Sequence, residues 1–467
     1  NTTARTEIIA GLTTFMTMAY IIALNPNLLT GFGKDTMPEL WNGVFLATCI
    51  ASAIGTIVMA FLANKPFAMA PGMGLNSFFA VVVTNIVALT GMTYVASFQA
   101  ALCIVLVEGI VFLILSVLNI REKIVDAIPL GVRLGIAPAI GLMLLNIGVG
   151  SNAGIYSENG GPFYAMRDFF GALTPSLAKT NMGSGYSAMV LSVVTMFVGL
   201  FAIVVLAQRG FKGAVLLGML IASIIYWAGE AIFLGTNPFA SLATASFVPA
   251  FGDMASTTLF KFNFQGFAQI GWFTAITLIV TFCIIDMFDT IGTLVGTASR
   301  AGMLDKDGKM PNMKQALLSD AVGTLAGSVT GTSTVTTFVE SASGVEAGGR
   351  TGLTSVVTAL LFVVSAFFAP LISAVPGAAT APALIAVGVM MLSSFKEIKW
   401  DDMEEAIPAF FAGIFMALCY SISYGIAAGF IFYCIVKCVR GRAKEIHPIL
   451  WVSTGLFILN FIILAII

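Results

Sequence analysis

A succession of apolar runs, each long enough to cross a lipid bilayer, constrains this chain more than any other feature of its sequence. A spanning helix needs about 20 apolar residues. The first half of the chain offers such runs at 6–29, 41–63, 94–119, 129–150, 186–208 and 212–235, with an interrupted run at 67–89. Hydrophobic residues make up 58% of the 467 residues and charged residues only 10%, values that exclude a soluble globular domain. The sequence therefore predicts an all-α polytopic membrane protein.

The second half of the chain continues the pattern. Apolar runs cover 270–297, 315–331, 351–374 and 380–395, and a polar, interrupted run surrounds Glu340. Beyond residue 400 the pattern is ambiguous, because 406–420 and 422–436 are each short and form either two half-depth helices or one kinked span. The last run, 448–467, either spans the bilayer or lies at its interface. We expect about 14 transmembrane segments, with about 15 as the alternative.

Positive charge favours one orientation of these segments. With the N-terminus in the cytoplasm, all Lys and Arg residues except Lys34, Arg167, Lys179 and Lys261 fall on the cytoplasmic side. Cytoplasmic loops carry the excess of Lys and Arg in membrane proteins. We therefore expect a multi-pass protein of the plasma (cytoplasmic) membrane with a cytoplasmic N-terminus, whose first span is not cleaved as a signal peptide.

Composition also limits the partners and cofactors. The net charge is −1, so the chain has no basic field for nucleic acid. His447 is the single histidine and the six cysteines lack metal-ligand spacing, so we expect no metal site and no cofactor. The lipid bilayer is the partner that composition implies directly.

Two segments are interrupted where a spanning helix would have to be continuous. In the third, Ala70-Pro-Gly-Met-Gly74 predicts an extended piece at 67–70 and a half-helix at 73–89, with Asn76 in its first turn. In the tenth, a Gly- and Thr-rich stretch predicts an extended piece at 332–336 and a half-helix at 337–348, with Glu340 in its first turn. Such backbone survives at membrane depth only inside protein or beside a wet cavity, so both breaks are candidate binding sites. The alternative is that Glu340 merely caps its helix.

The two halves of the chain show an internal duplication. Leu75-Asn-Ser77 after the first break matches Val339-Glu-Ser341 after the second, and the Pro-containing stretch 126–140 is similar to 373–384. Seven segments per half is an odd number, so the 7+7 repeats are predicted to be inverted relative to the membrane. The N-termini of the two half-helices then face each other at the bilayer centre, with room for a ligand between them.

Acidic residues converge on the same place. Asp286 and Asp289 lie at i and i+3 of the eighth segment and share one helix face. With Glu340 and Asn76 they would repel an anion, but they suit a neutral heterocycle with ring and exocyclic N–H donors. The alternative is that the aspartates pair with a cation elsewhere.

Neighbours of these residues are further candidates for ligand contact. Leu75 and Ser341 adjoin Asn76 and Glu340 in the sequence. Aromatic faces for stacking are available from Phe338, Phe288 and Phe78, although each of the 38 phenylalanines more commonly faces lipid or core.

Clustered carboxylates in a low dielectric cannot all ionise, which favours proton-coupled transport. The candidate proton carriers are Asp286, Asp289, Glu340 and Glu108. Glu108 and Asp320 lie in the middle of the fourth and ninth segments. For both, a proton relay and a structural hydrogen bond fit the sequence equally well.

Four stretches together resemble a known family. They are 6–26, Ala70-Pro-Gly-Met-Gly-Leu-Asn-Ser-Phe-Phe79, Asp286-Met-Phe-Asp-Thr-Ile-Gly-Thr293, and 331–341. They resemble the AzgA-like purine permeases of the nucleobase–cation symporter (nucleobase–ascorbate transporter) superfamily. By position, Asn76, Asp286 and Glu340 match that family's substrate-binding polar residues, and Asp289 matches its neighbouring acid.

The resemblance implies a 14-span fold that works by an elevator-like motion, often as a homodimer. A core domain would comprise 1–119 and 266–374, and a gate domain 120–265 and 375–467. The implied substrates are adenine, guanine and hypoxanthine, taken up with protons. Other classes remain open: an anion exchanger or ion channel on the same inverted-repeat plan, an intramembrane enzyme using an acid pair, or a uracil/xanthine permease of the wider superfamily.

Overall fold

A computed structural model describes residues 2–118, 130–152, 174–175, 186–240, 242, 245–300, 303, 310–419 and 422–466. Part of the repeat motif at 126–140 lies outside the described residues, as does the side chain of Phe288. Among the described residues, nine helices are long and apolar enough to cross a membrane, and three shorter apolar helices accompany them. The predicted all-α membrane fold is confirmed.

Helices of the first half occupy the predicted runs. Their bounds are α1 (Ala4–Met18), α2 (Tyr20–Leu29), α3 (Pro38–Val58), α4 (Met73–Thr90), α5 (Tyr94–Val117), α7 (Leu130–Ile147), α11 (Tyr186–Gln208) and α12 (Ala214–Gly229). The first predicted span is two helices that meet at Ala19.

The second half begins with two short helices, α13 (Phe251–Thr257) and α14 (Phe264–Gln269). The remaining helices are α15 (Trp272–Arg300), α16 (Met313–Thr330), α17 (Ser341–Glu346), α18 (Gly352–Ser365), α19 (Ala369–Ser373), α20 (Gly377–Met391), α21 (Met403–Phe410), α22 (Met416–Cys419), α23 (Ile422–Val439) and α24 (Pro448–Ile466). In the ambiguous region after residue 400, α21 and α22 are joined by a π-helical turn at Phe411–Phe415, and two long helices follow.

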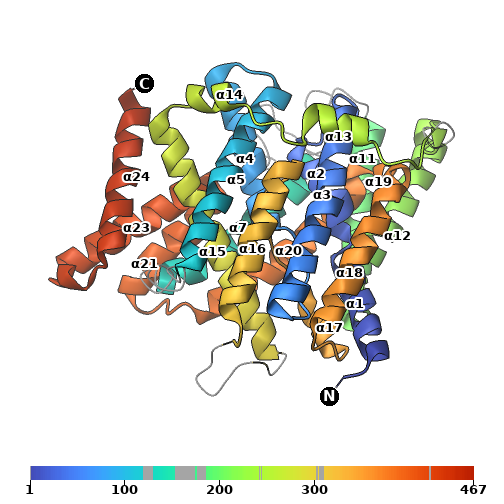
Figure 1. Cartoon of the computed structure of the whole chain (residues 1–467). Coiled ribbons are helices and arrows are strands. Elements are labelled where there is room, and N and C mark those ends of the chain that lie inside the picture. Colours follow the sequence, from blue (N-terminus) through green and yellow to red (C-terminus); the bar gives the residue numbers. More distant parts are fainter. Residues whose placement is uncertain are drawn as a thin grey trace.

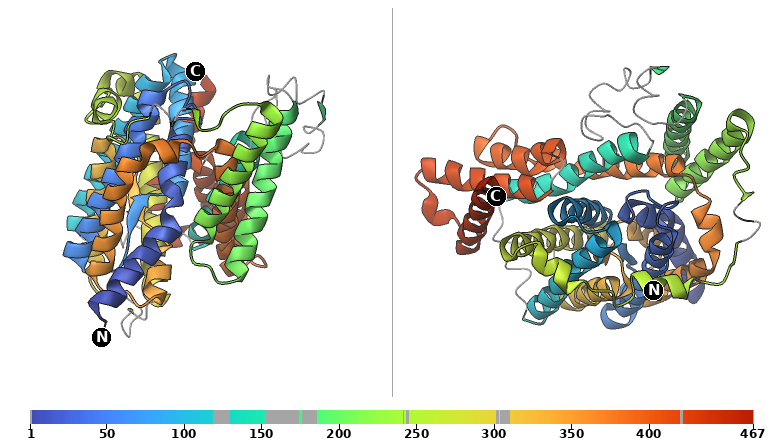
Figure 2. Two further views of the ribbon diagram at one scale, coloured as in Figure 1. Left: turned by 90° about the vertical axis from the view of Figure 1, so that its right-hand side faces the viewer. Right: turned by 90° about the horizontal axis from the view of Figure 1, so that it is seen from above.

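The helices pack in two groups (Figures 1 and 2). Seen from above, α7, α11, α12, α20 and α23 form a layer beside a bundle that contains α1, α3, α5, α16 and α18. Each group draws on both halves of the sequence. The connection that carries α13 lies on the bundle, where Gln99 Nε2 donates to the Thr257 carbonyl at 2.9 Å and Asn42 Nδ2 donates to Asp253 Oδ2 at 2.7 Å.

Two short strands mark the interrupted segments. β1 (Met69–Pro71) pairs antiparallel with β2 (Val335–Thr337), with Ala70 opposite Thr336. Each strand leads into a helix, α4 or α17. An antiparallel pair of strand–helix units is related by a local two-fold axis, which is the geometry that inverted repeats require.

The half-helix prediction for the tenth segment needs correction. The helix covers only Ser341–Glu346, not 337–348, and Glu340 is its N-cap residue rather than a member of its first turn. Strand contacts continue through Phe338, whose N–H donates to the Ala68 carbonyl at 2.9 Å. At the other end Gly348, with φ of +104°, stops the helix.

Candidate functional site

The two broken segments are tied together at their crossing. Gly72 N–H donates to the Thr334 carbonyl at 3.1 Å, and Ala68 N–H donates to Ser341 Oγ at 3.0 Å. These bonds satisfy backbone groups that have no helical partner, as membrane depth requires. The hydroxyl of Ser341, a predicted ligand contact, therefore joins the two segments.

At Gly72 the backbone comes close to side chains of β2 and α15. A Cβ atom there would lie 2.5 Å from Thr336 Cγ2 and 3.2 Å from Asp289 Oδ2. Only glycine allows this approach. Asp289 consequently lies beside the start of α4, at the strand crossing. Its carboxyl also interacts electrostatically with Asp320 and Glu340, so these acids form one cluster.

Glu340 is held by the junction of α1 and α2. Tyr20, which is 1% exposed, donates its hydroxyl to Glu340 Oε1 at 2.7 Å. Thr17 Oγ1 approaches the Glu340 carbonyl at 3.4 Å. The side chain makes no capping hydrogen bond to α17, so the capping role considered for it is not seen. The residue is half-buried.

Asn76 is more enclosed than its predicted role suggests. Its side chain is fully buried, and its amide donates to the Pro71 carbonyl at 3.1 Å. Its Oδ1 accepts a short hydrogen bond from the Ser333 hydroxyl. In this structure Asn76 therefore connects the two breaks.

Asp286 belongs to a buried polar network between α15, α16 and β2. Thr290 Oγ1 lies 3.0 Å from Asp286 Oδ1, 2.8 Å from Asp320 Oδ1 and 2.7 Å from Thr336 Oγ1. All four side chains are fully buried. Asp286 and Asp289 thus have different contacts around the same strand: Asp286 contacts Thr290 in this network, whereas Asp289 lies beside Gly72.

Glu108 lies fully buried on α5, where Thr334 donates its hydroxyl to Glu108 Oε2 at 2.7 Å. This contact supplies the hydrogen bond that the sequence left as one of two alternatives. Asn25 of α2 contacts the same extended stretch before β2, since its amide donates to Thr332 Oγ1 at 2.9 Å. Thr332 therefore contacts α2, and Thr334, two residues later, contacts α5.

The apolar candidates are buried side chains. Leu75 is fully buried, Phe338 is 5% exposed, and Phe78 packs on Phe282 with ring centroids 4.6 Å apart.

Sequence reasoning missed Tyr20 and Thr290. Both lie within stretches that carry the family resemblance, and a polar side chain inside an apolar run was the signal that could have found them.

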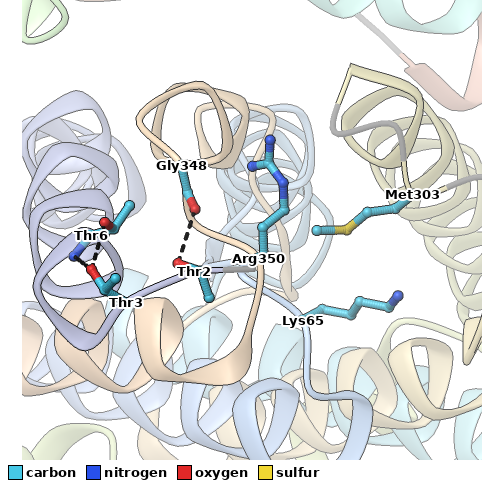
Figure 3. A pocket seen from close by; sticks show the side chains of 7 residues that line it. All are labelled: Thr2, Thr3, Thr6, Lys65, Met303, Gly348 and Arg350. Carbon is cyan, nitrogen blue, oxygen red and sulfur yellow. Dashed lines mark hydrogen bonds between the residues drawn. The ribbon is translucent and has the colours of Figure 1, made fainter.

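Two polar features lie away from these acids. A cavity of ≈590 Å³ at the N-terminal end contains none of the predicted site residues (Figure 3). Its lining residues are Thr2, Thr3, Thr6, Lys65, Met303, Gly348 and Arg350.

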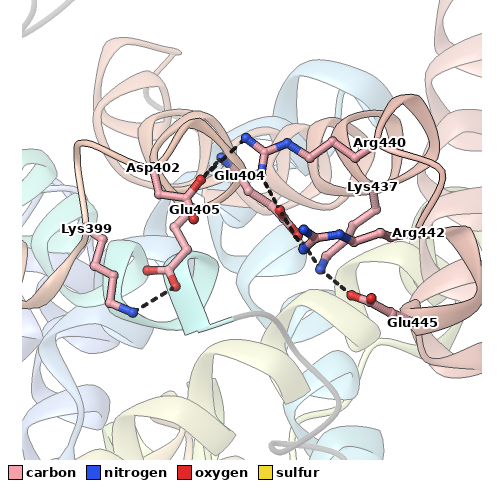
Figure 4. A network of polar contacts seen from close by, with 8 residues as sticks. All are labelled: Lys399, Asp402, Glu404, Glu405, Lys437, Arg440, Arg442 and Glu445. Atoms are coloured by element: carbon pink, nitrogen blue, oxygen red, sulfur yellow. Dashed lines mark hydrogen bonds and ion pairs between the residues drawn. The ribbon is translucent and has the colours of Figure 1, made fainter.

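The second feature is an ion-pair network centred on Glu404 (Figure 4). Arg440 Nη1 lies 2.6 Å and Arg442 Nη1 3.3 Å from Glu404 Oε2, and Lys437 contacts Glu404 Oε1. The hydrogen bond from Lys437 lowers the pKa of the Glu404 carboxyl, and the two arginines add to this effect. The network joins the start of α21 to the end of α23.

Comparison with known proteins places the chain among transporters. The model of the Permease family matches residues 5–428. The chain belongs to the Permease family. It is 40% identical over 468 residues to the guanine/hypoxanthine permease PbuG of Bacillus subtilis, a match that covers 99% of this chain and 97% of that protein. It is 37% identical over 463 residues to the adenine permease AdeP of Escherichia coli, covering 99% and 93%.

The fold of this Permease family member also has a solved counterpart. The transmembrane domain of a cyanobacterial bicarbonate transporter, BicA, superposes with a TM-score of 0.61 at 14% identity, covering 91% of this chain and 96% of that one. The likeness confirms the inverted-repeat transporter fold. The resemblance to purine permeases is confirmed by the sequence relatives, and the chain is a transporter rather than an enzyme.

Proposed function

We propose that this permease imports purine nucleobases (adenine, guanine or hypoxanthine) by proton symport. The observation that carries the proposal is the crossing of the two broken segments, around which Asp289, Glu340 and the Asp286 network gather. Carboxylates and amides suit a neutral heterocycle with several N–H donors. The names of relatives at 36–40% identity support the same substrate class.

The site residues have three roles in this proposal. Glu340 and Asp289 accept hydrogen bonds from the base, with Leu75 and Phe338 beside them, and Asn76 and Ser341 hold the two segments in register. Asp286, Asp289, Glu340 and Glu108 are the candidates for the coupling proton, because several carboxylates in one low-dielectric site cannot all ionise.

The mechanism we propose is an elevator motion of a core domain, 1–119 with 266–374, against a gate domain, 120–250 with 375–467. In this proposal residues 251–265 belong to the core and not to the gate that the resemblance implied, because α13 contacts both α3 and α5. Broken segments cannot be exposed singly to lipid, so the segments that carry the ligand have to move as one body. The protein is proposed to work in the cytoplasmic membrane, N-terminus inside, as a homodimer.

Uptake of radiolabelled adenine, guanine and hypoxanthine into proteoliposomes tests the proposal. A pH step, acidic outside, should drive saturable accumulation, and unlabelled xanthine and uracil should compete poorly. Accumulation that ignores the pH step but follows a sodium gradient would identify a different coupling ion. Chloride or bicarbonate flux without purine uptake would favour the anion-exchanger alternative, which the fold permits but the acidic site opposes.

A further inference from the structure

The hydroxyl of Thr290 has more contacts than its own proton can serve. It lies within 2.7–3.0 Å of oxygens from Asp286, Asp320 and Thr336. A threonine hydroxyl has one proton to donate and two lone pairs that accept. The carboxylate of an ionised aspartate only accepts. Three separate hydrogen bonds at these contacts require three protons, of which Thr290 supplies one and Thr336 at most one; with fewer protons, two carboxylates have to share the Thr290 proton.

The missing proton has to come from a carboxyl group. If Thr336 donates to Thr290 and Thr290 donates to one aspartate, the other aspartate must donate to Thr290, which it can do only when protonated. If Thr290 instead donates to Thr336, both aspartates must be protonated. In either arrangement at least one of Asp286 and Asp320 carries a proton. The full burial of both side chains favours the same outcome, because a second negative charge there would be costly.

We propose that Asp286 and Asp320 share one proton through Thr290, and that this pair is the site where the coupling proton is held. The role of this proton in transport rests on the proposed function, whereas the shared proton itself does not. In this proposal Asp320 holds the proton together with Asp286, and Thr290 positions the two carboxyl groups. Asp289 on α15, Glu340 next to α17 and Glu108 on α5 are the other acids that face this region.

Thr336 connects the shared proton to the crossing of the broken segments. It lies in β2 opposite Ala70 of β1, and its Cγ2 lies at Gly72 beside Asp289. When the proton leaves, two carboxylates compete for the single proton of Thr290, and Thr290 can no longer accept and donate as before. The hydrogen bond between Thr290 and Thr336 therefore differs between the two protonation states, because Thr290 has different donors and acceptors in each. The affinity for a purine bound at β2 then depends on whether the proton is present, and coupled transport requires this dependence.

Infrared spectroscopy of the purified full-length protein, without substrate, tests the shared proton directly. A protonated carboxyl has a C=O stretch distinct from that of a carboxylate. Difference spectra of wild type against Asp286→Asn and against Asp320→Asn at pH 7 should each show the loss of one protonated carboxyl band. In each variant the new amide donates to Thr290, so the remaining aspartate ionises. Difference spectra in which neither variant loses a protonated carboxyl band would overturn the proposal.

A hydroxyl series on α15 guards against loss of folding in the aspartate variants. Thr290→Ser keeps the hydroxyl and should keep the band, whereas Thr290→Val should shift it. Thr281→Val is the matched control, since the Thr281 hydroxyl is also buried on α15 but donates to the Thr277 carbonyl at 2.8 Å. An unshifted band in Thr290→Val would contradict the role of Thr290.

Purine binding separates this inference from the proposed function. In wild type, the affinity for purine should change with pH, and Asp320→Asn should reduce that change at least about tenfold over the same pH range. An infrared band without any purine binding would leave the shared proton intact and refute the substrate. Purine binding with an unaltered pH response in Asp320→Asn would refute the coupling role of the pair.

Discussion

At the scale of single residues, hydroxyl groups contact four of the acids around the broken segments. Tyr20 donates to Glu340, Thr334 donates to Glu108, and Thr290 contacts both Asp286 and Asp320. A hydroxyl holds a carboxylate without neutralising its charge, unlike Lys or Arg. The acids therefore stay available for a ligand or a proton while their orientation is restricted.

Tyr20→Phe should weaken purine binding about tenfold or more, because a hydrogen bond to a charged group contributes about 1.5–3 kcal/mol. The affinity is measured by titration of labelled purine. Tyr94→Phe is the control: it removes the same atom from a tyrosine that donates to the Leu29 carbonyl at 2.8 Å. Equal losses in both variants would assign the Tyr20 effect to packing. The double variant Tyr20→Phe/Glu340→Gln should be little worse than Glu340→Gln alone.

Glu340→Gln should abolish high-affinity purine binding in folded protein. An unpaired buried donor or acceptor costs about 1–3 kcal/mol, or about one to two decades in affinity. Glu346→Gln is the matched control, since Glu346 lies on the same short helix but is exposed and faces Lys212 at 4.0 Å. Unchanged binding in Glu340→Gln would remove this residue from the site.

At the scale of elements, a network of ion pairs adds to the packing between α21 and α23. The Glu404 network joins α21, a helix of 8 residues, to α23. The Glu404 side chain is 9% exposed, whereas those of Arg440 and Arg442 are 42% and 50% exposed. Solvent therefore screens part of each arginine contact, and the contribution of the network falls between those of a surface and a buried pair.

Glu404→Gln should lower the free energy of unfolding by about 1–3 kcal/mol at pH 7. The pKa of Glu404 is lowered in the folded state, so its stabilisation is present above the unfolded pKa of about 4.3 and is lost as the pH falls through the folded pKa. Thermal unfolding in detergent at pH 7 and at about pH 3 measures both effects, and the difference between variant and wild type should shrink in acid. Glu405→Gln, which loses only the 3.8 Å contact to Lys399, serves as the control. A difference that grows in acid would contradict this sign.

At the scale of the whole molecule, two helix groups lie side by side with each half of the chain in both (Figure 2). The groups touch where α1 meets the start of α12. A Cβ atom at Gly213 would lie 3.8 Å from Met16 Cβ, which suits a disulfide. This pair reports on movement between the two groups.

A disulfide in Met16→Cys/Gly213→Cys, made in a background without the native cysteines, should block uptake and leave purine binding within about threefold of wild type. An elevator cannot move when its two groups are joined, whereas the proposed ligand site lies among helices of one group. Uptake and binding are compared before and after reduction, which should restore transport. Full turnover with the crosslink intact would contradict the elevator proposal.

What the sequence by itself determined are features that depend on neighbouring residues. Apolar runs of spanning length set the helices, Pro71 and the glycines around it set the first break, and the i, i+3 spacing placed Asp286 and Asp289 on one helix. Tertiary structure decided which side chain each acid meets, because partners such as Tyr20 and Glu340 are 320 positions apart and no local pattern encodes their distance. It also decided the length of α17. Local composition predicted a helix from Thr337, but pairing of β2 with β1 keeps Thr337 and Phe338 extended. Backbone groups at membrane depth must find partners, and here a strand from the other half of the chain supplies them.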